Sequence, residues 1–131
     1  MDRIERLQPS ALFAIPSIKA AARVGNLLFV SGQVPLGPTG ELIGTGDFRM
    51  QAELVFSNLG AVLKTGDSGF DRIIKLTSFF TDIGRDLPVF REVRDRHIAK
   101  EHATASSAVQ VSQLFHPAAW LEVEAIALCG N

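Results

Sequence analysis

The chain has 131 residues, of which 47% are hydrophobic and 21% are charged, and its formal net charge is −1 at pH 7. This length suits one domain, residues 1–131, with a substantial core, and the composition is that of a globular protein, not a disordered one. A near-neutral charge spread along the chain argues against a nucleic-acid-binding protein, which needs a basic patch.

The sequence contains no apolar run long enough to span a membrane. The stretch "MDRIERLQPS" alternates charged with single apolar residues and so lacks the hydrophobic segment of a signal peptide. The single cysteine, Cys129, has no partner for an internal disulfide. We therefore expect a cytoplasmic protein that does not contact membranes, with Cys129 as an inert packed or exposed thiol.

The first third of the chain predicts strands and a loop. In "AARVGNLLFVSGQVP", Gly25-Asn26 tolerates positive φ between two apolar runs, which indicates two strands joined by a tight turn. A short additional strand over residues 3–7 would precede them. Residues 33–47 are rich in glycine and proline and predict a loop. The loop has neither GxGxxG nor GxxxxGK spacing, so we do not interpret it as a phosphate site.

The middle of the chain predicts a helix and then a strand. Apolar residues recur at spacings of three and four from Ala52 to Val62, with Asp47 as N-cap and a stop at Lys64 and Gly66. The next segment, "RIIKLTSFFTD", is rich in β-branched and aromatic residues and predicts a buried strand.

The last third predicts a second helix and two strands. Asp86-Leu87-Pro88 opens the helix, because proline is accepted in a first turn, and "VFREVRDRHIAK" continues it. "SSAVQVSQLF" and "AWLEVEAIAL" predict strands separated by "HPA". The order of elements is that of an α+β fold, a sheet with two helices packed on one face.

The predicted strands are apolar on both sides at several points, namely Ile73, Phe79, Val109 and Val111. A sheet with helices on one face needs apolar residues on that face only. We therefore expect the second face to be buried against other subunits in an obligate homo-oligomer. Phe79, Phe80 and Trp120 are expected to be core or interface aromatics.

Two carboxylates stand out in "AWLEVEAIAL". Side chains alternate along a strand, so Glu122 and Glu124 point away from the face that carries Leu121 and Val123. One interpretation is that Glu122 activates water in a cleft. The other is a structural pair held by basic side chains, for example Lys75 beside Glu124, because buried charges must be paired.

Four stretches carry a resemblance to a known family: "RVGNLLFVSGQVP", "QAELVFSNLGAVLKTG", "KLTSFFTDI" and "WLEVEAIAL". In this order and spacing, from about residue 18 to residue 128, the chain resembles the Rid/YjgF superfamily, also called L-PSP endoribonucleases. The resemblance implies a chorismate-mutase-like fold and a homotrimer with a central β-barrel. It also implies small-molecule clefts between subunits and hydrolysis of reactive enamines and imines without metal or cofactor.

The resemblance also assigns site residues. It places Ser31 and Gly32 of "SGQ" at the ligand and makes Glu122 the residue that orients water. The family's carboxylate-binding arginine falls on Ser106 in "TASSAVQVSQL", and serine cannot replace a bidentate cation. We therefore hypothesise that Glu122 favours a neutral or cationic ligand. The family's N-terminal tyrosine maps near Ile18.

Other residues leave alternatives open. Ser106 and Ser107 could donate hydrogen bonds to a ligand, but no Ser-His-Asp arrangement supports a nucleophile. Arg94, near the family's helix-2 asparagine, could supply positive charge or be a solvated surface residue. The histidines show no metal-ligand spacing.

Three functions remain at this stage. The leading one is an enamine or imine deaminase, the second a non-catalytic metabolite-binding or regulatory module. RNA cleavage is the weakest, because the charge is near neutral and no histidine pair suits acid-base work.

Overall fold

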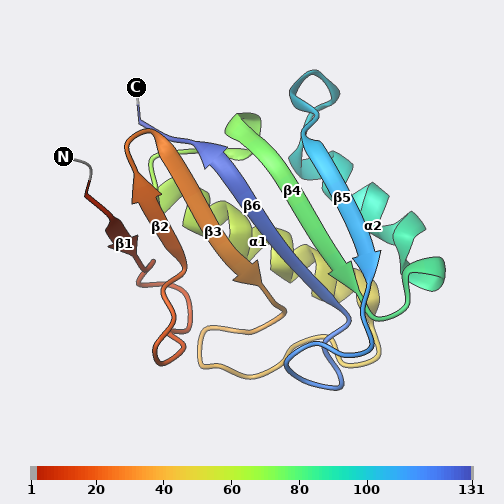
Figure 1. The fold of residues 1–131 in the computed structure, drawn as a ribbon. Coiled ribbons are helices and arrows are strands. Elements are labelled where there is room, and N and C mark those ends of the chain that lie inside the picture. The colour runs from red at the N-terminus through yellow and green to blue at the C-terminus, as the bar shows by residue number, and fades with distance from the viewer. Residues whose placement is uncertain (1–2, 131) are drawn as a thin grey trace.

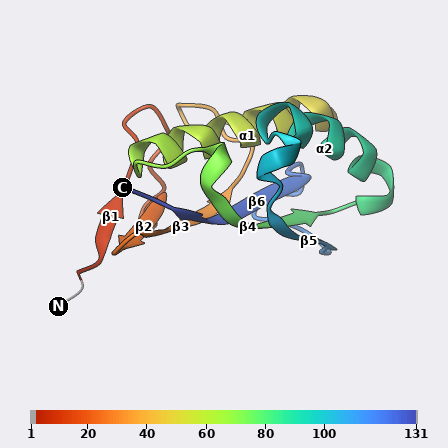
Figure 2. The same cartoon turned by 90° about the horizontal axis from the view of Figure 1, so that it is seen from above.

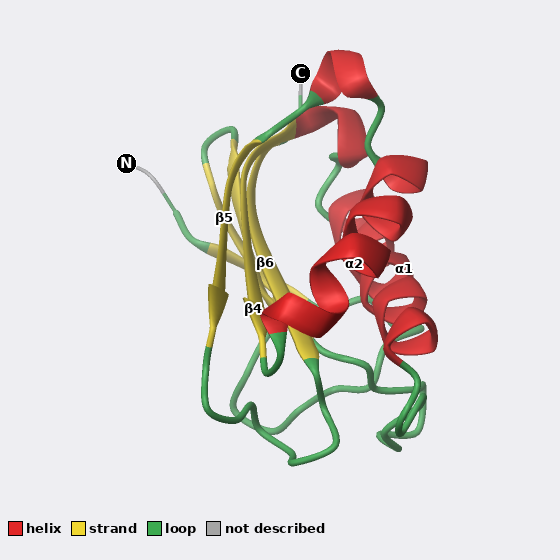
Figure 3. Ribbon diagram, turned by 90° about the vertical axis from the view of Figure 1, so that its right-hand side faces the viewer, coloured by secondary structure: helices red, strands yellow, loops and turns green. Residues whose placement is uncertain are grey.

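The computed structural model describes residues 3–130, which form a six-stranded mixed sheet with two helices on one face (Figures 1 and 3). The strand order is β1-β2-β3-β6-β4-β5; β4 and β5 are parallel, and the other neighbours are antiparallel. The predicted α+β architecture is confirmed. The elements are β1 (Glu5–Leu7), β2 (Ala21–Val24), β3 (Leu27–Gln33), α1 (Phe48–Thr65), η1 (Phe70–Arg72), β4 (Ile73–Phe80), α2 (Ile83–His97), η2 (Lys100–His102), β5 (Ala105–Gln110) and β6 (Leu121–Leu128).

The hairpin β2–β3 and helix α1 form where the sequence predicts them. Gly25 adopts φ 59° in the turn between the two strands, a conformation that glycine reaches without strain. The Asp47 side chain caps α1 by accepting a hydrogen bond from Met50 N at 3.1 Å. At the other end, Gly66 N donates to Val62 O at 3.0 Å. The short predicted strand at the N-terminus is present as β1.

Helix α2 begins three residues earlier than predicted. Its N-cap is Asp82, whose side chain accepts from Arg85 N at 3.2 Å, and Pro88 lies inside the helix. The prediction was wrong because it gave the proline more weight than the capping aspartate. Pro88 removes only the bond that its missing N–H would donate to Gly84, whose carbonyl is still close to the helix end. Asp86, predicted to open the helix, is instead buried and receives two bonds from Arg85, at 2.8 and 2.9 Å.

Strand β5 is shorter than the predicted "SSAVQVSQLF". It begins at Ala105 and ends at Gln110, opposite Phe80 at the end of β4. A strand needs a partner to continue, and beyond Phe80 the chain enters α2. Strand β5 is also an edge of the sheet, and all six of its residues are exposed.

The two faces of the sheet differ strongly. One face packs on α1 and α2, and Leu28, Leu76, Phe80 and Leu121 are completely buried there (Figure 2). No helix or strand of residues 3–130 covers the other face, as Figure 3 shows. Its apolar side chains are accordingly exposed: Phe29 by 43%, Ile74 by 46%, Val109 by 43% and Leu128 by 38%.

The residues from which a second apolar face was predicted do not all lie on the uncovered face. Phe79 and Val109 are paired on the uncovered face, whereas Ile73 is buried on the helix side and Ile74 is exposed in its place. The irregular pairing of Ile73 and Lys75 with β6 explains the difference. Burial of this face against other subunits stays a prediction. Cys129 is 1% exposed, so the packed thiol is the correct alternative.

Candidate functional site

Glu122 lies on the uncovered face of the sheet, in the middle of the strand order. Its neighbours Leu121 and Val123 are buried against the helices, and Glu122 is paired with Phe79 of β4. The predicted alternation is therefore confirmed. The pKa of the Glu122 carboxyl is raised, first because partial burial disfavours its charged form and second because Glu124 adds negative charge nearby.

Gly32 provides the space in which Glu122 lies. The register of β3 against β6 shifts between Val30 and Gln33, so Gly32 sits in an irregular stretch of the strand beside β6. A Cβ at Gly32 would come within 2.6 Å of Glu122 Cδ and 2.9 Å of its Cγ. The glutamate side chain therefore crosses the bare backbone of Gly32. The structure brings together these two residues, which are 90 positions apart, as the resemblance implied.

Ser31 fastens the segment before β2 to this irregular stretch. Its Oγ donates to Lys19 O at 2.7 Å, and its backbone N donates to Ala20 O at 2.9 Å. Ile18, the next residue back, is 52% exposed. Ile18, Ser31 and Gly32 line one hollow, and the Glu122 side chain lies against Gly32; we call the surface around these four residues the groove.

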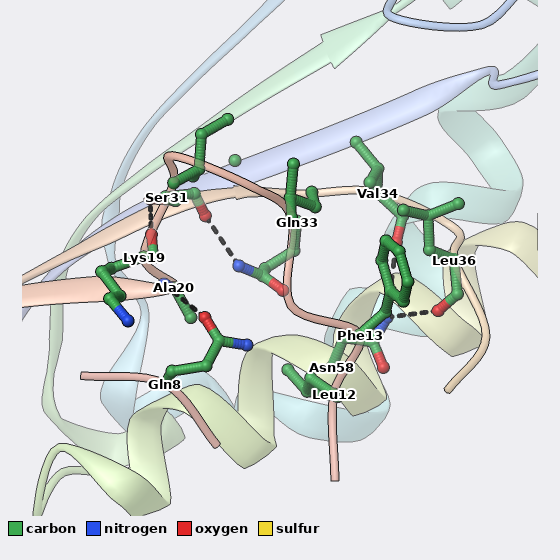
Figure 4. Close-up of a pocket in the computed structure, with 13 residues that line it drawn as sticks. Gln8, Leu12, Phe13, Lys19, Ala20, Ser31, Gln33, Val34, Leu36 and Asn58 are labelled. Carbon is green, nitrogen blue, oxygen red and sulfur yellow. Dashed lines mark hydrogen bonds between the residues drawn. The ribbon is translucent and has the colours of Figure 1, made fainter. Parts of the chain in front are cut away.

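A narrow hollow of about 460 Å³, including its open mouth, adjoins the groove (Figure 4). Lys19 and Ser31 lie at one end and Phe13 and Leu36 at the other. Polar wall groups are already bonded to the backbone: Asn58 Nδ2 donates to Leu36 O at 3.1 Å, and a Gln8 side-chain oxygen accepts from Ala20 N, also at 3.1 Å. Satisfied polar groups of this kind hold the wall in one arrangement.

A second, wider hollow of about 1430 Å³, including open solvent, is also lined by the segment from Ile15 to Lys19. Arg6 of β1 and Phe29 of β3 contribute to its wall. The two hollows share five residues: Gln8, Ile15, Ile18, Lys19 and Ser31. The groove is therefore bordered by two depressions that meet at Ile18 and Lys19.

The serines of β5 are separated from Glu122 within one chain, because β4 lies between β5 and β6. Neighbouring strands are about 4.8 Å apart, so β5 lies roughly 10 Å from β6. Ser107 Oγ accepts a hydrogen bond from Lys75 Nζ at 2.8 Å. Within residues 3–130 Lys75 makes no ion pair with Glu124, contrary to the structural pair that the sequence suggested. Ser106, in the same exposed strand, has no contact with Glu122 across β4.

Arg94 lies on α2, in the layer that covers the opposite face of the sheet. Its Nε donates to Asp95 at 2.9 Å, and its guanidinium lies 5.8 Å from the centre of the Phe90 ring. A single chain therefore does not bring Arg94 to Glu122. Its role, like the roles of Ser106 and Ser107, stays a prediction.

Sequence reasoning missed three residues beside the groove: Gln8, Phe13 and Lys19. Their only sequence signal is proximity to Ile18, because they lie in a segment without regular periodicity. For metals, no group of three histidine, cysteine or acidic side chains suited to an ion occurs in the described part of the chain. Likewise, neither helix of that part is both long and apolar enough to span a membrane.

Comparison with known proteins extends the resemblance. The family model described as Endoribonuclease L-PSP matches residues 9–129. A RutC family protein of Pyrococcus abyssi is 35% identical over 108 residues, which cover 82% of each chain. TdcF of Escherichia coli, to which a reactive intermediate deaminase activity is ascribed, is 36% identical over 108 residues, 80% of this chain and 81% of TdcF.

Solved structures agree with this assignment. The crystal structure of RidA from the Antarctic bacterium Psychrobacter sp. PAMC 21119 superposes with a TM-score of 0.84 at 30% identity, covering 94% of this chain and 97% of RidA. The chain therefore belongs to the Rid/YjgF superfamily, the family of the L-PSP endoribonuclease description.

Proposed function

We propose that the groove hydrolyses reactive imines, and enamines after their tautomerisation, to a carbonyl compound and ammonia. The observation that carries this proposal is the Glu122 carboxyl, which lies across Gly32 on an open face and has a raised pKa. The activity ascribed to TdcF supports the same reaction class. No step requires a metal or cofactor.

Glu122 would move protons during hydrolysis. Its carboxylate accepts a proton from water while the water oxygen bonds to the imine carbon, and the nitrogen takes up a proton to give a carbinolamine. Transfer of the hydroxyl proton to nitrogen then breaks the C–N bond and releases ammonia and the carbonyl product. A carboxyl with a raised pKa is better suited to both accepting and donating near neutral pH than an ordinary one.

We further propose that the protein works as a cytoplasmic homotrimer whose subunits cover the uncovered sheet faces of one another. The exposure of Phe29, Ile74, Val109 and Leu128 supports this, because several large apolar side chains exposed on one face of a sheet indicate an interaction site. In such an assembly the exposed strand β5 of a neighbour, with Ser106 and Ser107, would be available to complete the groove.

The test uses imines generated in situ by an amino-acid oxidase, with semicarbazide competing for the imine. The wild-type protein should reduce semicarbazone formation, and Glu122→Gln should lower this activity at least about 100-fold, the usual scale for loss of a general acid-base group. The matched control is Glu124→Gln, two residues along the same face, which should keep most activity. No acceleration by the wild type over a panel of imines would overturn the proposal.

A second candidate, non-catalytic binding of a metabolite in the same groove, is favoured by one observation: Ser106 stands where the resemblance implies a cationic clamp. It predicts ligand binding without turnover in the same assay. RNA cleavage has less support, because two of the histidines are engaged elsewhere. His97 stacks on Phe56 at 5.4 Å between ring centres, and His116 Nδ1 accepts from Ala118 N at 3.0 Å.

A further inference from the structure

We infer that the narrow hollow is a binding site for neutral ammonia, the nitrogen product of the proposed hydrolysis. Three side-chain amides in its wall, those of Gln8, Gln33 and Asn58, supply the polar contacts. The inference rests on the proposed function for the source of the ammonia, but the binding site itself is tested without catalysis.

Two of these amides lie between the sheet and α1, not on the uncovered face. Gln33 is paired with Val123 of β6, which is buried against the helices, and paired residues project to the same side of a sheet. Asn58 reaches the hollow from α1, and both amide side chains belong to residues that are only 8% exposed. A subunit that covers the other face of the sheet would therefore not displace them.

Hydrogen bonds to the backbone fix which end of each amide is free. Gln33 Nε2 donates to Ser31 O at 3.0 Å, and Asn58 Nδ2 donates to Leu36 O at 3.1 Å, as Figure 4 shows. A backbone carbonyl oxygen only accepts, so the bonded end of both amides is the NH₂ group. The side-chain oxygens of Gln33 and Asn58 are therefore the free ends.

The free ends of the three amides offer two acceptors and one donor. Gln8 is reversed relative to the other two, because its oxygen accepts from Ala20 N at 3.1 Å and its NH₂ group is the free end. Gln33 Oε1 and Asn58 Oδ1 have no hydrogen-bond partner within residues 3–130. In that part of the chain, Ser78 Oγ is the one fully buried side-chain oxygen or nitrogen without a partner. The two amide oxygens are therefore not enclosed by protein but open to the hollow that their residues line.

Ammonia matches this set of groups in size and in hydrogen bonding. The centre of a water-sized molecule can move within about 50 Å³ of the hollow, and one water needs about 10–15 Å³, so the hollow suits the smallest molecules of the reaction, water and ammonia. Ammonia donates to both amide oxygens, and its lone pair accepts from the Gln8 NH₂ group. Ammonium has no lone pair, and Lys19 in the same wall adds positive charge, so the neutral form is preferred. Gly32, which the Glu122 side chain crosses, also lines the hollow, so ammonia formed at Glu122 is released beside it.

The experiment adds ammonium chloride to the protein and follows the NMR chemical shifts of the side-chain carbonyl carbons of Gln33 and Asn58. At pH 9 both carbons should shift in a saturable way. At pH 7 the same total concentration should have a smaller effect, because less of the ammonia is neutral. Potassium chloride at equal concentration should shift neither carbon. Gln33→Met removes one acceptor and should weaken the binding measured at Asn58 by up to about tenfold, the scale of one hydrogen bond.

Leu36→Phe enlarges a side chain in the wall of the hollow and should abolish the shifts. Leu42→Phe is the matched control, because Leu42 is the bridge partner of Leu36 but does not line the hollow, and this variant should respond like the wild type. The inference is overturned by an absent response, by equal responses to ammonium and potassium chloride or at the two pH values, or by a response that survives Leu36→Phe. If ammonia binds but no imine is hydrolysed, the site stands and the catalytic proposal fails. If imines are hydrolysed but ammonia shifts neither carbon, the reverse holds.

Discussion

Replacing Gly32 by alanine places a methyl group where the Glu122 side chain now lies. The new Cβ would be 2.6 Å from Glu122 Cδ and nearer still to Oε2, and ordinary contact begins at 3.4 Å, so the carboxyl must move by at least about 0.8 Å. The atoms in the way belong to the end of a flexible side chain, so the backbone need not shift. The cost in folding free energy is therefore at the low end of overpacking, about 1 kcal/mol.

The effect on activity should be much larger than the effect on stability. A displacement approaching 1 Å of a group that must meet a water and an imine carbon lowers the rate on the order of 100-fold. The assay is imine hydrolysis with semicarbazide competition, alongside thermal unfolding. Gly84→Ala is the control, because a Cβ at Gly84 meets nothing within 4 Å, and this variant should keep full activity.

Shortening the Glu122 side chain tests whether its contact with the new methyl group causes these effects. In Gly32→Ala combined with Glu122→Asp, the shorter side chain relieves the contact, so the two changes together should destabilise by less than the sum of their separate effects. Folded Gly32→Ala protein with activity within twofold of the wild type would refute the reasoning. It would mean that the position of Glu122 over Gly32 does not matter for the reaction.

Three further predictions follow from the structure. Because the pKa of Glu122 is raised in the fold, the native state holds its proton more tightly than the unfolded state, and stability falls as pH rises from the ordinary glutamate pKa to the raised one. In Glu122→Gln, Tm measured from pH 4 to 8 should lack this fall. A pH profile of Tm identical to that of the wild type would contradict the reasoning. Gln51→Leu should lower the unfolding free energy by about 2–4 kcal/mol in a denaturant titration, because it leaves the partly buried Ala118 O and Trp120 N without the buried Gln51 amide that binds them. A loss below about 1 kcal/mol would count against that role. Phe29→Glu, on the uncovered face, should convert the proposed trimer into a folded monomer in sedimentation experiments, and an unchanged assembly would place the subunit contact elsewhere.

Local chemistry explains which elements could be predicted from the sequence. The turn at Gly25 and the cap at Asp47 depend on a few neighbouring residues, and both are confirmed. The start of α2 was wrong because two local signals, Asp82 and Pro88, compete, and sequence alone does not rank them. The end of β5 was wrong because a strand stops where its partner stops, and that partner, β4, is distant in sequence.

The site was predictable to a similar extent. Alternation along β6 was enough to place Glu122 away from the core, and this is confirmed. Its position over Gly32 depends on a register shift in β3, between Val30 and Gln33, that no local sequence pattern predicts. Lys19 could not be found, because an exposed lysine in the sequence has the same appearance whether it faces bulk solvent or a hollow.

The amide of Gln51 has a consequence for the opposite layer of the molecule. From its buried position on α1 it donates to Ala118 O at 2.8 Å and accepts from Trp120 N at 2.8 Å, immediately before β6. A slip of one residue in β6 would turn Leu121 and Val123 outward and bury Glu122 under the helices. The Gln51 side chain on α1 therefore helps to fix the register of β6, and with it the face of the sheet on which Glu122 lies. In this way a helix on one face of the sheet affects the position of a carboxyl on the other face.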